Sequence, residues 1–169
     1  MNVCPIMGVR MERNKERKKT VRLVIQRVTE ASVSIEGTCV GTIGKGYMVL
    51  FGAGAGDTKE MAERLFHKMI NLRIFADENG KTNKSIRDVN GELLVVSQFT
   101  LYANCKKGNR PSFLEAGSPK EAEELYEYFL ELAKTEYGSC EHGEFGADMQ
   151  VSLCNDGPFT IILDSKELL

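Results

Sequence analysis

The 169-residue chain is 42% hydrophobic and 27% charged, a composition typical of one folded domain with its own core. Its formal net charge of −2 argues against a protein that binds nucleic acid through charge alone. No apolar run reaches the roughly 20 residues of a membrane span, and the five cysteines form no C-x-x-C pair. We therefore expect a cytoplasmic protein with no membrane association, disulfide framework or metal site.

Residues 1–20 differ from the rest in charge. They hold six basic side chains against two acidic ones, a local balance of +4: Arg10, Arg13, Lys15, Arg17, Lys18 and Lys19 against Glu12 and Glu16. Such charged termini are usually solvated. We expect 1–20 to be a disordered extension and 21–169 to be the folded domain.

The segment that follows predicts a β-meander and then a helix. The stretches "VRLVIQRV", "ASVSIEG" and "CVGTIGKGYMVLFGAG" are rich in branched residues, alternate in polarity, or are apolar and punctuated by glycine. Asp57 lies three residues before Glu60, which is capping-box spacing. An amphipathic helix is predicted from about Thr58 to Asn71, with an apolar face of Ala62, Leu65, Phe66, Met69 and Ile70.

Next, "LRIFADENGKTN" indicates a short strand and a polar turn. "GELLVVSQFTLYA" predicts one buried central strand, in which Phe99 shares the parity of the core residues and of Ser97. The basic loop "NCKKGNRPSF" leads to Ser118 as N-cap with Pro119 at N1, so a second amphipathic helix is predicted to about residue 136.

The end of the chain, "FGADMQVSLCNDGPFTIILDS", predicts two apolar strands. Asn155, Asp156 and Gly157 are typical of a tight hairpin turn, but Pro158 has no N–H to give a β-ladder. The whole pattern predicts a single α+β domain with a largely antiparallel, barrel-like sheet and two helices.

The residues alone assign little chemistry. His67 and His142 stand apart from other catalytic groups, and Ser97, Thr100 and Thr160 lack a G-x-S-x-G or S-x-x-K context. "FGAGAGD" lacks the lysine of a phosphate-binding loop. No cofactor is expected.

Two short motifs, "SQFTL" at 97–101 and "NDGPFT" at 155–160, resemble the signatures of the D-aminoacyl-tRNA deacylases, once called D-tyrosyl-tRNA deacylases. The resemblance continues through "VIQRV", "NLRIF", "KGNRPSF" and "FGADMQVSL", from about Val21 to Ser165. Phe159 departs from it, because a smaller aliphatic residue is usual there.

The resemblance implies a homodimer that hydrolyses the ester between a D-amino acid and the terminal adenosine of tRNA. The Gly157–Pro158 bond would be cis and would enter the partner's pocket, where its carbonyls would exclude L side chains. Glycine has no side chain to exclude and would be accepted. The implied catalytic residues are Ser97, Gln98, Phe99 and Thr160, and the implied substrate-binding residues are Gly157, Pro158, Arg27 and Met149. Arg27 would secure the Gly-Pro segment.

The mechanism and the RNA contacts are left open by the resemblance. The attacking group is either Thr160 or a water assisted by the RNA 2′-hydroxyl, and the lack of a base beside Thr160 favours the second. Backbone amides near Gln98 and Phe99 are the candidate oxyanion donors. Lys106, Lys107 and Arg110 either hold tRNA phosphates or form a solvated loop.

Two other functions are compatible with the sequence. One is an RNA-binding module that uses the same dimer surface without cleavage. The other is a hydrolase of different acyl esters with Ser97 or Thr160 as nucleophile, which an acyl phosphonate would label covalently.

Overall fold

The computed structural model describes residues 20–168, and their main feature is a curved six-stranded sheet. The strand order is β2-β1-β3-β6-β7. Along β1, residues 22–28 pair with β3 and residues 31–35 pair with β2, while β8 pairs with both parts of β1. All pairings are antiparallel except the parallel β3–β6 and β6–β7. The strands are β1 (Arg22–Ile35), β2 (Thr38–Ile43), β3 (Gly46–Gly52), β6 (Glu92–Ser97), β7 (Glu141–His142) and β8 (Met149–Asp164), while β4 (Phe75–Ala76) and β5 (Thr82–Lys84) form a separate hairpin.

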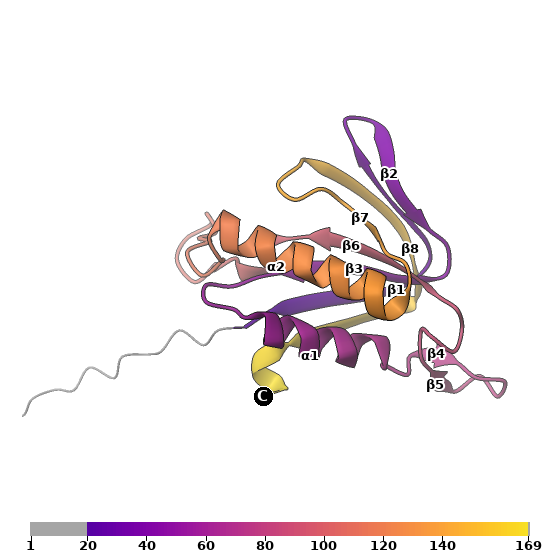
Figure 1. Cartoon of the computed structure of the whole chain (residues 1–169). Helices are drawn as coiled ribbons and strands as arrows, with labels where there is room; N and C mark the ends of the chain where they lie inside the picture. Colours follow the sequence, from indigo (N-terminus) through magenta and orange to yellow (C-terminus); the bar gives the residue numbers. More distant parts are fainter. Residues whose placement is uncertain (1–19, 169) are drawn as a thin grey trace, which may run out of the picture.

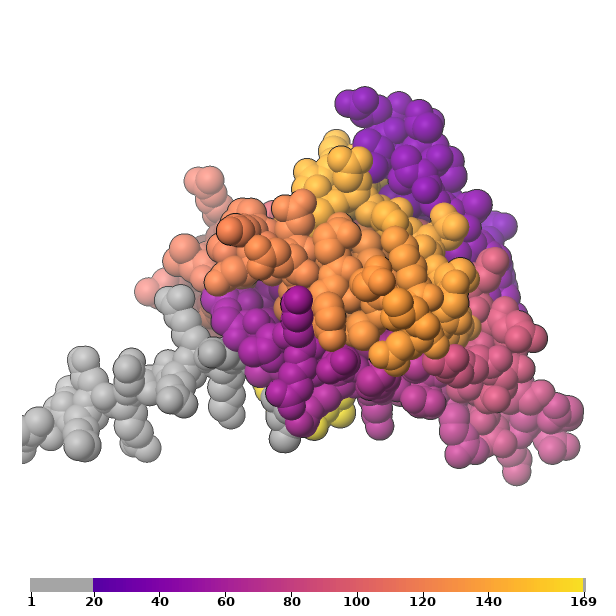
Figure 2. Space-filling model, viewed as in Figure 1, coloured from indigo at the N-terminus to yellow at the C-terminus, as the bar shows by residue number. Residues whose placement is uncertain are grey.

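Two helices, α1 (Lys59–Ile70) and α2 (Pro119–Leu132), lie side by side on one face of the sheet (Figure 1). Their apolar faces and the sheet enclose the main core, in which the Phe129 ring lies 5.0 Å from Phe51 and 5.6 Å from Phe66. In the space-filling view the helices cover the centre of this face, and β2 and part of β8 project beyond them (Figure 2). The α+β prediction with a barrel-like sheet is therefore confirmed.

A second, smaller core fills the other face of the sheet, where β1, β2 and β8 curl over β3 and β6. It consists of Val28, Ala31, Val33, Ile43, Met48, Leu94 and Val96. No helix of residues 20–168 is long and apolar enough to cross a membrane.

The predicted central strand is shorter than expected. It ends at Ser97, and the next residues form a 3₁₀ helix, η1 (Phe99–Tyr102). The Tyr102 hydroxyl donates a hydrogen bond to the Gly52 carbonyl at 3.1 Å, which turns the chain back over the end of β3. Phe99 consequently leaves the core and is 58% exposed.

The predicted hairpin at 155–160 is also wrong. Both halves of β8 pair with β1: Gln26 lies opposite Thr160 and Val28 opposite Asn155. Residues 156–159 therefore form a wide bulge opposite Arg27 within one continuous strand. We call this segment the 156–159 bulge.

The helix boundaries differ from prediction by small steps. Thr58, not Asp57, is the N-cap of α1, and its side chain accepts from the Met61 N–H. After α2 the chain continues as a π-helical turn, η2 (Ala133–Tyr137), which ends at Gly138 with φ at +112°. Thr20, which the sequence placed in the N-terminal extension, forms hydrogen bonds with Asp164 and Tyr102. The rest of the predicted extension, residues 1–19, lies outside the described residues.

Asp57 does not cap α1 but binds the backbone of the loop before it. Its Oδ2 accepts from the Gly54 N–H at 2.6 Å, and its Oδ1 is buried with no hydrogen-bond partner among residues 20–168. Burial raises the pKa of Asp57 to about 6. The folded protein therefore holds a proton that the unfolded chain has lost above about pH 4, and the free energy of unfolding falls as the pH rises from about 4 to 6.

Replacing Asp57 with asparagine removes this charge. We expect the variant to be more stable than the wild type by about 1 kcal/mol at pH 8, a figure reduced for partial solvent screening, and to show little difference at pH 4.5. Urea unfolding at both pH values measures the effect, with the exposed Asp148→Asn as control. A difference that does not change with pH would contradict the assignment to Asp57.

Candidate functional site

A cavity of about 420 Å³ opens where β3 and β6 end. Its walls come from those strand ends, from η1, from the start of α2 and from the loop that enters β8. The cavity brings together four of the predicted site residues, Ser97, Gln98, Phe99 and Met149. It does not include Arg27, Thr160 or any residue of the 156–159 bulge.

The backbone at the cavity offers two free donors. The Gln98 N–H donates to the Phe51 carbonyl at 2.7 Å, so this amide is engaged and the expectation that it is an oxyanion donor is wrong. The Gln98 side chain donates to the Thr100 hydroxyl at 2.6 Å. The N–H groups of Phe99 and Thr100 have no acceptor in the part of the chain that the structure describes. Phe99 lines the cavity and Thr100 is the next residue, so these two N–H groups are the candidate donors to an anionic oxygen at this wall.

The 156–159 bulge is held by Arg27. The Arg27 Nε lies 3.1 Å from the Asp156 carbonyl oxygen and 3.2 Å from Asp156 Oδ2, while Nη1 donates to the Ile74 carbonyl. The guanidinium also lies over the Phe159 ring, 4.7 Å from its centroid. The Arg27 side chain is only 13% exposed, so the contacts are partly shielded from water.

Gly157 and Pro158 are joined by a cis peptide bond and are both exposed. Gly157 has φ at +133°, and a Cβ there would lie 3.1 Å from Arg27 Nη2. Glycine is therefore required both by the backbone conformation and by the close packing of Arg27.

Thr160 has no activating base. Its hydroxyl accepts from Asn155 Nδ2 at 3.1 Å and lies 3.5 Å from Gln26 Nε2. No carboxylate, imidazole or amine of residues 20–168 hydrogen-bonds to it. Without a base to accept its proton, a threonine hydroxyl is a weak nucleophile.

Asn155, which the sequence indicated only as a turn residue, links the two ends of the bulge in the structure. Its Oδ1 accepts from the Phe159 N–H at 2.8 Å and its Nδ2 donates to Thr160, so one side chain bridges the bulge. The sequence signal for this contact is the asparagine at the start of the "NDGPFT" motif, because asparagine side chains often hydrogen-bond to the backbone of the residues that follow.

The bulge and the cavity lie apart in one chain. Ser97 pairs with Phe51, which pairs with Leu23, so β6 and β8 are separated by β3 and β1. At about 4.8 Å per strand spacing, some 14 Å of sheet lies between Ser97 and β8. One protomer therefore does not assemble all the predicted site residues.

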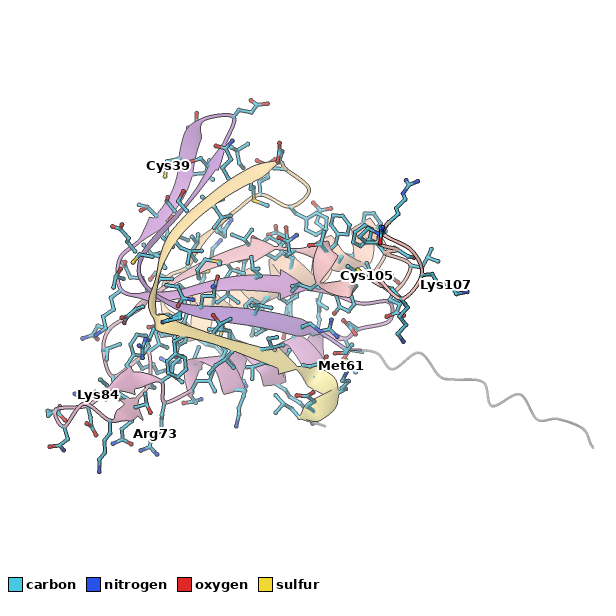
Figure 3. All side chains as sticks on the ribbon, turned by 180° about the vertical axis from the view of Figure 1, so that it is seen from behind. Cys39, Met61, Arg73, Lys84, Cys105 and Lys107 are labelled. Carbon is cyan, nitrogen blue, oxygen red and sulfur yellow. The ribbon has the colours of Figure 1, made fainter. Side chains whose placement is uncertain are left out.

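The three predicted phosphate-binding cations, Lys106, Lys107 and Arg110, are exposed on the loop after η1. Figure 3 shows Lys107 at one end of the molecule and Arg73 and Lys84, near the β4–β5 hairpin, at the opposite end. Within the described residues no group of three or more His, Cys, Asp or Glu side chains is placed to hold a metal ion.

Comparison with known proteins gives a consistent result over the whole folded part. The sequence profile of the family described as D-Tyr-tRNA(Tyr) deacylase matches residues 24–164. The D-aminoacyl-tRNA deacylase of Clostridium novyi (strain NT) is 53% identical over 147 residues, which cover 87% of this chain and 99% of that protein. The D-aminoacyl-tRNA deacylase of Thermosipho africanus (strain TCF52B) is 56% identical over 148 residues, which cover 88% of this chain and 99% of that protein.

A solved structure is similar as well. The c-Myc DNA unwinding element binding protein is 45% identical and superposes with a TM-score of 0.80, covering 84% of this chain and 97% of its own.

Proposed function

Because the chain belongs to the D-Tyr-tRNA(Tyr) deacylase family and is therefore a hydrolase acting on aminoacyl-tRNA, we propose that it is a homodimer that removes D-amino acids from tRNA, with each active site built from two protomers. One protomer supplies the cavity, with the free N–H group of Phe99 in its wall and that of Thr100 in the next residue. The partner supplies Gly157 and Pro158. One observation supports the proposal most directly. The exposed 156–159 bulge, which Arg27 holds in place, lies apart from the cavity of its own chain, so it can contribute to a site only in a partner's cavity.

An apolar row on the sheet supports the dimer. Ile162, Val24 and Leu50 are paired across β8, β1 and β3, and Leu50 is paired with Val96, which lines the cavity. Ile162 is 62% exposed, two residues after Thr160. Val24 and Leu50 are half-buried and Val96 is buried, so Ile162 is the exposed end of the row, and exposed apolar side chains can mark protein interfaces. A second copy on this row would lie beside both the bulge and the cavity.

In the proposed reaction the ester carbonyl lies against the N–H groups of Phe99 and Thr100, which stabilise the oxyanion as water attacks. The RNA 2′-hydroxyl assists this water, and Gln98 and Met149 position the substrate. The carbonyl groups of Gly157 and Pro158 occupy the space that an L side chain needs. Selection is then by exclusion, without a specific grip on the D side chain.

Exclusion predicts a particular substrate pattern. We expect cleavage of D-alanyl-tRNA and glycyl-tRNA at comparable initial rates, and cleavage of L-alanyl-tRNA at least about 100-fold more slowly. Glycine is cleaved because it has no side chain to exclude. Initial rates measured side by side on the three substrates test this, and full sparing of glycyl-tRNA would require positive recognition of the D side chain instead.

Two results would identify the alternatives. An RNA-binding module would bind all three aminoacyl-tRNAs and cleave none. A serine or threonine acyl hydrolase would form a covalent adduct with an acyl phosphonate at Ser97 or Thr160. The absence of a base beside the Thr160 hydroxyl among residues 20–168 argues against Thr160 as the nucleophile of the second alternative.

A further inference from the structure

The loop of residues 105–114 is closed by a backbone bridge and is attached through the residues that follow it to the chain beside the cavity. Asn104 and Ser112 exchange two backbone hydrogen bonds of 2.8 and 3.0 Å. Beyond them, the Gly117 N–H donates to the Ala53 carbonyl at 3.0 Å, next to the cavity wall. The tip of the loop is thus held beside the cavity while its side chains stay exposed.

Phe113 on this loop extends the aromatic wall of the cavity outward. Its ring centroid lies 5.0 Å from that of Phe99, with an angle of 69° between the ring planes. Phe99 is 58% exposed, Phe113 36% and the neighbouring Leu114 79%. Two adjoining aromatic rings, Phe99 in the cavity wall and Phe113 next to it, are therefore accessible, and aromatic faces of this kind stack on unpaired bases.

The same loop is strongly basic. Lys106, Lys107 and Arg110 occur within five residues, and 104–112 contains no acidic residue. None of the three forms an ion pair among residues 20–168, whereas Arg22 and Arg27 are both paired with carboxylates. Unneutralised cations beside exposed aromatic rings are typical of surfaces that bind single-stranded nucleic acid.

We propose that the 105–114 loop binds the unpaired nucleotides that precede the terminal adenosine of the tRNA. Phe113 stacks on a base, Leu114 packs beside it, and Lys106, Lys107 and Arg110 contact the phosphates. The inference rests on the proposed function, because the ester in the cavity fixes where the RNA strand leaves the enzyme. The strand leaves over the rim of the cavity, and Phe113 beside Phe99 offers an exposed aromatic ring on one side of that rim.

The test compares three D-alanyl esters of increasing length, those of adenosine, of the trinucleotide CCA and of whole tRNA. We expect Phe113→Ala to lower kcat/KM about tenfold on CCA and tRNA and to leave the adenosine ester unchanged. The triple variant Lys106→Ala/Lys107→Ala/Arg110→Ala should also lower kcat/KM on CCA and tRNA and leave the adenosine ester unchanged. In addition, kcat/KM on tRNA should depend less on salt concentration than in the wild type. Val40→Ala and Lys68→Ala/Lys134→Ala, exposed residues elsewhere, serve as controls.

Three results would overturn the inference. Equal losses on all three esters would mean that Phe113 only shapes the cavity wall. Conversion of Phe113→Ala to a monomer in sedimentation would assign the loop to the contact between protomers. If the wild-type protein cleaved none of the D-alanyl esters, the proposed function itself would fail, and that outcome is distinguishable because it does not depend on the variants.

Discussion

Replacing Arg27 with alanine is expected to lower the rate of D-alanyl-tRNA cleavage about 100-fold, because the 156–159 bulge loses the side chain that fixes its position. Three contacts disappear together: those to the Asp156 backbone, to the Asp156 carboxylate and to the Phe159 ring. Arg27→Lys should have a cleavage rate close to that of Arg27→Ala, since an ammonium group cannot reproduce the planar guanidinium hydrogen bonds or the stacking on Phe159. Arg64→Ala, which breaks an exposed pair with Glu60, is the matched control and should stay within about twofold of wild type.

Mixed dimers test whether the bulge acts on the partner's cavity. A protomer with Arg27→Ala has a defective bulge and an intact cavity. A protomer with Phe99→Pro, which lacks the Phe99 N–H, has an intact bulge and a defective cavity. If the bulge acts across the interface, the mixed dimer contains one complete site and recovers about half of the wild-type activity, although both parent homodimers are nearly inactive. Absence of recovery in a mixed dimer confirmed by mass spectrometry would place the bulge in its own protomer's site, contrary to the proposal.

A 2′-deoxy terminal ribose, with the ester on the 3′ oxygen, is expected to slow cleavage by at least about 100-fold, whereas Thr160→Ala keeps activity within about threefold. The reason is the environment of Thr160, whose hydroxyl accepts from Asn155 and has no base to deprotonate it. The 2′-hydroxyl lies next to the ester and can assist the attacking water without help from the chain. Single-turnover rates on both substrates with both proteins measure the effects.

Thr82→Ala, an exposed threonine on β5, controls for loss of a hydroxyl. Inactivation by Thr160→Ala together with normal turnover of the 2′-deoxy substrate would reverse the assignment and identify Thr160 as the nucleophile.

The sequence by itself determined the helices, the core and the family. The apolar spacing of Leu65, Phe66, Met69 and Ile70 predicted the buried face of α1, because helical periodicity is a local property of the chain. The Ser118-Pro119 pair likewise predicted the start of α2, where Ser118 accepts from the Glu121 N–H. The two motifs that indicated the family are also contiguous stretches, readable without any knowledge of the fold.

Only the tertiary structure decided how the site residues are placed. Alternating polarity continued through Phe99, yet the strand ends at Ser97, because Tyr102 bonds the distant Gly52 carbonyl. Asn155, Asp156 and Gly157 favour a turn of any kind, and whether the chain reverses there depends on β1, which pairs with both halves of β8. The hydrogen bond that engages the Gln98 amide and the distance between bulge and cavity also arise from pairing between segments remote in sequence, which no local pattern encodes.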